Sequence, residues 1–236
     1  MTGSGALDDA KDGPYFTRMP LLVPYATALL LGSLHALEPD HVAAVTSFAV
    51  RRPGTRHAVR YGVRWAVGHG VIIVVLGAVL VTTGVHLPLA AGPWLERLVG
   101  VTLIALGGWT LLHARGLHAH LHTHADGTVH AHLHSHTLKR THDHGHAASG
   151  VGVMHGLAGT GAAMALIPVA GFESPAAAVG YLVVFALGTV GGMALYGMLA
   201  GLLVARAALW SVRYARVLAG AVGVCTVVIG CVWLAG

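Results

Sequence analysis

Long apolar segments are the feature that most constrains this chain. Six of them are long enough to span the roughly 30 Å hydrocarbon core of a bilayer; they lie at about 20–37 (with an extension to 50), 62–84, 94–113, 150–170, 175–204 and 213–235. Only 10% of the residues are charged, against about 25% in soluble domains. We therefore predict an all-α polytopic membrane protein with about six transmembrane helices, in contact with the lipid bilayer.

Basic residues predict how these helices are oriented. All but Lys11, Arg18 and Arg97 of the 14 Lys and Arg lie in or beside the connections 1–2, 3–4 and 5–6, which is a positive-inside bias. We expect a cytoplasmic (inner) membrane location, both termini outside and the 3–4 loop in the cytoplasm. The expected organisation is a mobile tail at 1–19, helices 1–3 at 20–113, the loop at 114–147, and helices 4–6 at 148–236.

Several functional classes have no support in the sequence. No phosphate-binding G-x-x-x-x-G-K-[ST] motif occurs, and nothing resembles a serine or cysteine triad, so we expect neither an enzyme nor a prosthetic group. The basic residues lie between apolar runs, which is not the pattern of a nucleic-acid surface. Cys225 and Cys231 form no C-x-x-C motif, and we expect both to be small buried side chains.

The sequence HALEPDH, residues 35–41, directly follows an apolar run. On an unbroken helix His35, Asp40 and His41 would not share a face. Pro39 lacks an N–H, and it pushes Glu38 away from helical geometry. We therefore predict a helix break at Glu38 and Pro39, with Asp40 at or near the N-cap of a second helix. A cytoplasmic turn is the alternative, but residues 41–50 are almost wholly apolar, unlike an interfacial helix.

Two further histidines fall within apolar segments, His69 in RWAVGHGVIIVVLG and His155 in VGVMHGLAGTGAA. Either one alone could be a buried histidine bonded to a carbonyl. An intramembrane carboxylate is costly unless it is compensated, and a divalent cation bound by imidazole and carboxylate would compensate it. The sequence therefore predicts a metal path formed by His35, Asp40, His41, His69 and His155.

The 3–4 loop is rich in histidine, with a near-repeat of twelve residues that starts at 118 and again at 130. Alternating histidines of this density are typical of metal binding, so we predict a secondary metal-binding loop. A turn at Asp126-Gly127-Thr128 would pair His124 with His130 and His122 with His132; the loop could equally stay disordered until metal binds. The candidate ligands are His118, His120, His122, His124, His130, His132, His134, His136, His142, His144 and His146.

HALEPDH resembles the H-x-x-x-x-D-H signature of the nickel/cobalt permease superfamily. The blocks LGSLHALEPDHVAAV, RWAVGHGVIIVVLG and GVMHGLAGTGAA, with a His-rich stretch before the third, resemble its six-span branch of urease accessory protein UreH-like and NicO-like permeases. Two departures are Glu38-Pro39, where eight-span members usually have an acidic-alanine pair, and the absence of two further spans. The last two spans match only in general character.

This resemblance implies a secondary transporter for Ni²⁺ and also Co²⁺, with His35, Asp40 and His41 as selectivity ligands and His69 on the path. Asp40 favours uptake, because related exporters tend to have Gly there. A nickel chaperone or urease or hydrogenase maturation proteins are the partners it implies. The alternatives are an exporter with the same ligands, a non-transporting membrane metal-binding or accessory protein, and, more weakly, a zinc permease.

Overall fold

The computed structural model describes residues 19–51, 54–84, 92–123, 129–135, 145–158, 165 and 168–236. Its helices are α1 (Met19–His35), α2 (Pro39–Arg51), α3 (Thr55–Thr83), α4 (Gly92–Arg115), α5 (Gly145–Ala158), α7 (Pro175–Trp210) and α8 (Val212–Ala235). The remaining elements are a 3-10 turn, η2 (Pro168–Gly171), and two strands, β1 (Leu117–Thr123) and β2 (Val129–Ser135). The predicted all-α membrane fold is therefore confirmed, with a hairpin added between α4 and α5.

Four of these helices are long and apolar enough to cross a membrane: α3, α4, α7 as far as Ala207, and α8. Helices α1 and α5 are shorter, with 17 and 14 residues. Large apolar side chains such as Leu203 and Val232 are exposed on the surface of the bundle, as expected of a surface that faces lipid chains. The structure is that of a polytopic membrane protein, while the predicted number of six spans, the orientation and the domain limits stay predictions.

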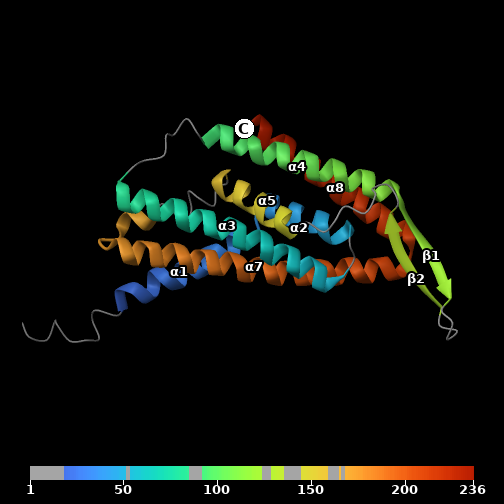
Figure 1. Ribbon diagram of the computed structural model, residues 1–236, viewed down its shortest axis with the longest axis horizontal. Coiled ribbons are helices and arrows are strands. Elements are labelled where there is room, and N and C mark those ends of the chain that lie inside the picture. The colour runs from blue at the N-terminus through green and yellow to red at the C-terminus, as the bar shows by residue number, and fades with distance from the viewer. Residues whose placement is uncertain are drawn as a thin grey trace, which may run out of the picture.

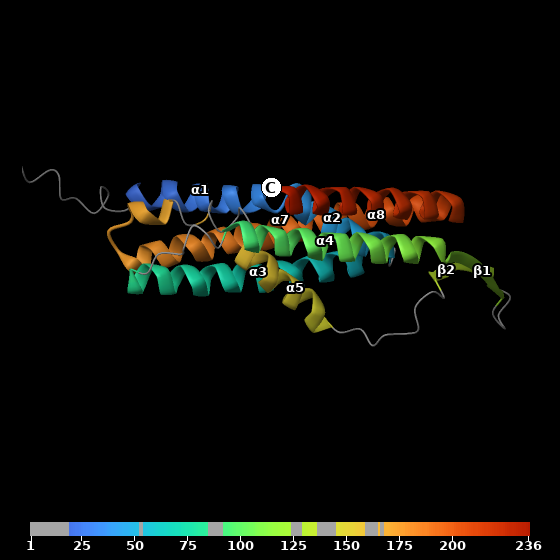
Figure 2. The ribbon, with the colours of Figure 1, turned by 90° about the horizontal axis from the view of Figure 1, so that it is seen from above.

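In the view of Figure 1, α2 and α5 lie between α3 and the pair formed by α4 and α8, whereas α1 lies at the edge beside α7. Helices α3 and α7 pack along each other, α1 packs on α7, α5 packs on α3, and α4 pairs with α8. Helix α2 contacts α3, α4, α7 and α8, and both views show it beyond the end of α1 along the long axis (Figures 1 and 2). This arrangement buries His35 and Asp40 on either side of the break in the interior of the bundle, while Leu37 and Pro39 between them are exposed.

The predicted break is confirmed. Helix α1 ends at His35, and α2 begins at Pro39, where a proline fits because the first helical N–H needs no partner. The His35 carbonyl accepts a bond from the Glu38 N–H at 3.1 Å, and the Glu38 carbonyl accepts the first bond of α2, from the Val42 N–H. Glu38 is thus the residue that precedes the helix, and Asp40 lies within the first turn.

The two halves of the chain repeat the same helix contacts at an interval of 120 residues (152 − 32). A side chain at Gly32 of α1 would collide with the carbonyl of Phe185 on α7, and one at Gly152 of α5 with the carbonyl of Trp65 on α3. The pairs 32/152 and 185/65 are each separated by this interval. Because only glycine allows so close an approach, α1 on α7 and α5 on α3 are equivalent packings.

Two expectations need correction. The hairpin register pairs His122 with His130 and His120 with His132, so the strands join through five residues rather than three. A two-residue shift keeps histidine opposite histidine, because strand faces alternate with a period of two. Both cysteines are exposed on α8, since α8 buries only one face.

Candidate metal centre

The structure brings together the five histidine and aspartate residues predicted from three separate sequence blocks. His35 comes from the end of α1, Asp40 and His41 from the start of α2, His69 from α3 and His155 from α5. Each side chain is at most 2% exposed. Polar groups buried this deeply in a bundle of apolar helices need partners or a ligand, so their contacts decide what the cluster does.

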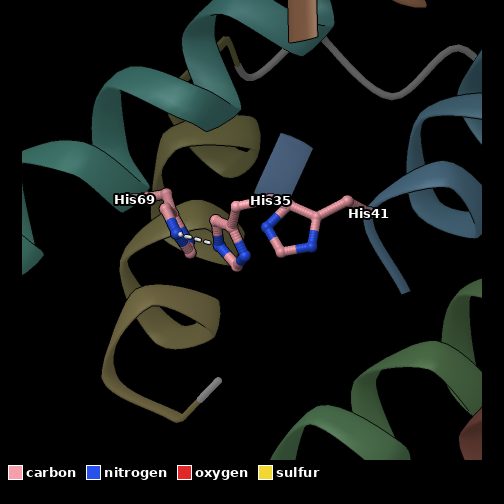
Figure 3. Close-up of side chains that lie close together, drawn as sticks. All are labelled: His35, His41 and His69. Carbon is pink, nitrogen blue, oxygen red and sulfur yellow. Dashed lines mark hydrogen bonds between the residues drawn. The ribbon is translucent and has the colours of Figure 1, made fainter. Parts of the chain in front are cut away.

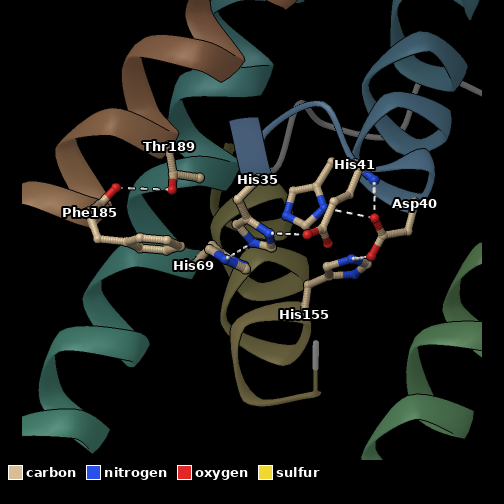
Figure 4. A network of polar contacts seen from close by, with 8 residues as sticks. His35, Asp40, His41, His69, His155, Phe185 and Thr189 are labelled. Atoms are coloured by element: carbon tan, nitrogen blue, oxygen red, sulfur yellow. Dashed lines mark hydrogen bonds and ion pairs between the residues drawn. The ribbon is translucent and has the colours of Figure 1, made fainter. Parts of the chain in front are cut away.

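Asp40 is the hub of one group of contacts (Figure 4). Its Oδ1 accepts a hydrogen bond from the backbone N–H of His41 at 2.8 Å and lies 2.9 Å from the Nδ1 of the same residue. Its Oδ2 lies 2.7 Å from the Nε2 of His155. The Asp40 carboxylate therefore joins α2 to α5 through the ring of His155.

A second group of contacts centres on His35 (Figure 3). Its Nε2 lies 3.1 Å from the Nε2 of His69, and its Nδ1 lies 3.0 Å from Oε1 of Glu38. The His41 ring lies between His35 and Asp40 in Figure 4, with its centroid 4.4 Å from that of His35. His41 thus belongs to both groups.

Two aromatic residues that the sequence did not single out pack against these rings. The Trp65 ring lies 5.1 Å from His41 and 5.1 Å from His155, and the Phe185 ring lies 5.6 Å from His35 (centroid distances). Both are fully buried. The available signal for Trp65 was its position four residues before His69, which places both on one face of α3.

Glycines let the helices that carry the ligands approach. A side chain at Gly68 would collide with the Ser149 carbonyl on α5, and one at Gly156 would lie 2.8 Å from the His69 carbonyl. Gly68 directly precedes His69, and Gly156 directly follows His155. Close packing of α3 and α5 is therefore what brings His69 and His155 into one cluster.

Two sets of donor atoms are close enough to hold one ion. One atom from each of His35, His41 and His69 lies within 4.8 Å of the others, and the same is true of Asp40, His41 and His155. Neutral imidazole with carboxylate suits Ni, Co, Zn, Cu and Fe rather than Mg or Ca. The chemistry of the donors therefore fits a divalent transition metal.

The loop histidines are only partly described. His118, His120, His122, His130, His132 and His134 lie in β1 and β2, where their backbones pair directly. His146 is in α5, while His124, His136, His142 and His144 lie outside the described residues. The loop stays a predicted metal-binding segment.

The fold and the cluster define a class of protein: a polytopic helical membrane protein with a buried histidine and carboxylate centre at a broken helix. The chain belongs to the cytochrome C biogenesis protein transmembrane region family, whose sequence pattern matches residues 25–232.

Curated relatives narrow this assignment. The chain is 28% identical to Urease accessory protein UreH of Bacillus sp. (strain TB-90) over 189 residues, 78% of this chain and 79% of that protein. It is 28% identical to Chloroplast protein FOR GROWTH AND FERTILITY 2 of Arabidopsis thaliana, over 85% of this chain and 52% of that protein. It is 30% identical to Chloroplast protein FOR GROWTH AND FERTILITY 1 of the same plant, over 72% of this chain and 47% of that protein.

The aligned part is thus about half the length of the two plant relatives. No solved structure matches the chain. The similarity to Urease accessory protein UreH agrees with the resemblance seen in the three sequence blocks.

Proposed function

We propose that this protein is a secondary transporter that moves Ni²⁺, and also Co²⁺, across the cytoplasmic membrane into the cell. The observation that supports it best is the convergence of five buried imidazole and carboxylate side chains from four helices at one helix break. The name of the UreH relative supports a nickel-related role, and we extend that role to this chain as part of the proposal.

The position of the cluster suits transport. A hydrated ion entering from outside would exchange water for imidazoles at the α1–α2 break, and would leave toward the cytoplasmic loop. Conduction needs a site that binds strongly enough to dehydrate the ion and weakly enough to release it. Neutral imidazoles with two nearby carboxylates, Glu38 and Asp40, meet that need, and the loop histidines would capture the ion on exit.

The test is the nickel content of cells over time, measured with radioactive nickel. Cells carry the wild type, Asp40→Asn, a deletion of 117–146, or empty vector, at matched membrane expression. We expect the wild type to gain nickel above vector and Asp40→Asn to gain none. Nickel below the vector level would instead establish export, and equal nickel would reject transport of this ion.

A second candidate is a membrane accessory protein that binds nickel and passes it to a maturation protein without transport. The word "accessory" in the name of the UreH relative favours it. A wild type equal to vector in the uptake assay, with its loop binding nickel and retaining a urease or hydrogenase maturation protein, would support this candidate instead.

A further inference from the structure

The corner between α7 and α8 exposes large apolar side chains at the tip of a helical hairpin. Helix α7 ends at Trp210 and α8 begins at Val212, with Ser211 between them. Leu209 is 81% exposed and Trp210 is 78% exposed. The ring of Tyr214, also exposed, lies edge-on to that of Trp210 with the centroids 6.1 Å apart. Such side chains are unfavourable in water, whereas Trp and Tyr are favoured at the level of lipid headgroups.

Three arginines surround this corner. Arg206 lies four residues before Trp210, and thus on the same side of α7, while Arg213 and Arg216 lie three residues apart on one side of α8. All three are exposed. At a rise of about 1.5 Å per residue, each lies within roughly 8 Å of Ser211 along its own helix. The three guanidinium groups are therefore carried at a similar depth, beside the two exposed aromatic rings.

The helical hairpin contributes no negative charge of its own. Neither α7 nor α8 contains an Asp or a Glu. In the described part of the chain, the acidic residues are Glu38 and Asp40 at the buried centre, Glu96 near the start of α4, and Glu173 before the start of α7. The α7–α8 corner lies at the other end of both α4 and α7 (Figures 1 and 2). Its charge is thus complementary to an anion from outside the hairpin.

The start of α4 offers a comparison at the opposite end of the bundle. Trp94 is exposed there as well, and the guanidinium carbon of Arg97 lies 5.1 Å from the centroid of its ring. Glu96 directly precedes Arg97, so this aromatic and basic pair has an acidic neighbour in sequence. The two ends therefore share an exposed tryptophan and differ in charge.

The surroundings of the arginines favour a lipid over a soluble acidic partner. Exposed apolar side chains continue along both helices from the arginines, among them Leu203 on α7 and Val217 on α8. Helix α7 has 36 residues and is about 54 Å long, which exceeds the roughly 30 Å hydrocarbon core. Its end therefore reaches the headgroup region. A molecule with an anionic head and acyl chains can contact both the arginines and these apolar side chains.

We propose that the α7–α8 corner binds the headgroup of an anionic phospholipid. Arg206, Arg213 and Arg216 attract its phosphate, and Trp210 and Tyr214 lie beside its glycerol. Strand β1 packs against α8, so the bound lipid also holds the start of the His-rich hairpin close to the membrane surface. This site is separate from the buried centre and does not depend on which ion the centre binds.

The first test measures lipid affinity. The purified full-length protein, in a neutral detergent, is titrated with phosphatidylglycerol or phosphatidylcholine, and bound lipid is counted by native mass spectrometry. The wild type should bind phosphatidylglycerol more tightly than phosphatidylcholine. The triple variant Arg206→Gln, Arg213→Gln, Arg216→Gln should bind phosphatidylglycerol about 100-fold more weakly, since each basic residue near an anionic surface contributes about five-fold. Its affinity for phosphatidylcholine should not change.

Arg97→Gln is the matched control, because it removes an exposed arginine beside an exposed tryptophan at the other end of the bundle. Its affinity for phosphatidylglycerol should equal that of the wild type. Equal affinities in the triple variant and in this control would overturn the proposal. Size-exclusion chromatography of each variant checks that the protein is folded.

The second test distinguishes a lipid from other anions. An excess of inorganic phosphate or of a polyglutamate peptide should leave phosphatidylglycerol bound to the wild type, because neither has acyl chains. Trp210→Ala should weaken the binding of phosphatidylglycerol, since it removes part of the apolar contact. Displacement by inorganic phosphate would identify a site for a free anion, and displacement by polyglutamate a site for an acidic protein. Either result would overturn the assignment to a lipid.

Discussion

The two halves of this protein pack alike but differ in chemistry. At the interval of 120 residues, His35 corresponds to His155, and Trp65 corresponds to Phe185, with both aromatic rings packed on imidazoles. His69 corresponds to Thr189, which is fully buried and donates its hydroxyl to the Phe185 carbonyl of its own helix. The close glycine contacts between helices thus occur in both halves, whereas four of the five buried histidine and aspartate residues of the centre lie in the first half.

The difference extends to the helix break. By the same interval, Thr160 and Gly161 occupy the sequence positions of Asp40 and His41, although their structure lies outside the described residues. Neither can supply an anionic or imidazole group. The comparison teaches that close helix packing creates the interior position, and that ligand chemistry is an independent property of the side chains placed there.

The largest expected effect separates His69 from its counterpart Thr189. His69→Ala removes one of the five converging donor side chains, so nickel uptake should fall by more than about 10–100-fold, the usual cost of losing only a hydrogen-bond partner of a metal ligand. Thr189→Val keeps the shape and loses one hydrogen bond within α7, so uptake should stay near the wild type. The measurement is the initial rate of radioactive nickel uptake by each variant at matched expression. Equal losses in the two variants would mean that both halves of the protein contribute equally to nickel transport.

The next effect concerns stability and should be the same in both halves. Gly32→Ala and Gly152→Ala force a side chain against the Phe185 and Trp65 carbonyls, which should cost about 1–3 kcal/mol. Gly191→Ala and Gly150→Ala are matched controls on α7 and α5, with no atom within 4 Å of the added carbon. Thermal unfolding in detergent checks this; a loss confined to one half would break the packing equivalence.

A smaller effect is expected where α2 is held in place. The Ser47 hydroxyl lies 2.9 Å from the Thr226 hydroxyl of α8, and both side chains are fully buried. Ser47→Ala should cost about 0.5–1.5 kcal/mol, because Thr226 still donates to the Val222 carbonyl. A double-mutant cycle of Ser47→Ala and Thr226→Val, measured by thermal unfolding, gives the coupling energy between the two hydroxyls. Zero coupling energy would show that the bond contributes nothing to the position of α2.

The hairpin should have the smallest effect on uptake. Replacing the six paired histidines of β1 and β2 by Gln should lower the amount of nickel bound at saturation, measured by equilibrium dialysis, because each imidazole is a candidate ligand. The initial rate of uptake should change least of all the variants, since the buried centre remains. A rate reduced as far as that of His69→Ala would place the loop on the obligatory path.

Much of the site could be predicted from the sequence. Pro39 alone predicted the break, because the missing N–H and the restriction on Glu38 are local effects. His69 and His155 were identified since a histidine in an apolar span is costly without a partner. The roles were harder to assign. The part that each carboxylate plays depends on how the imidazole rings lie, and these rings pack against one another and against Trp65 and Phe185, which come from distant parts of the sequence.

Two other features could not be predicted, because they also depend on contacts between distant segments of the chain. The register of the His-rich hairpin is compatible with several two-residue shifts, because each keeps the alternation of histidines, and backbone pairing selected one. Whether Cys225 and Cys231 are buried depends on which face of α8 packs against α4. The sequence does not indicate that face, because α8 carries apolar residues on all of its faces.

The sequence by itself determined that this chain lies in a membrane, that its first apolar segment is broken at Glu38 and Pro39, and that a few polar residues are placed where lipid alone could not solvate them. These are consequences of hydropathy and backbone geometry, which act locally. Only the tertiary structure decided that four helices meet at that break, because glycine contacts between distant segments set the distances. The same packing placed these ring nitrogens and the Asp40 carboxylate within hydrogen-bond distance of one another, and that proximity defines the chemistry of the centre.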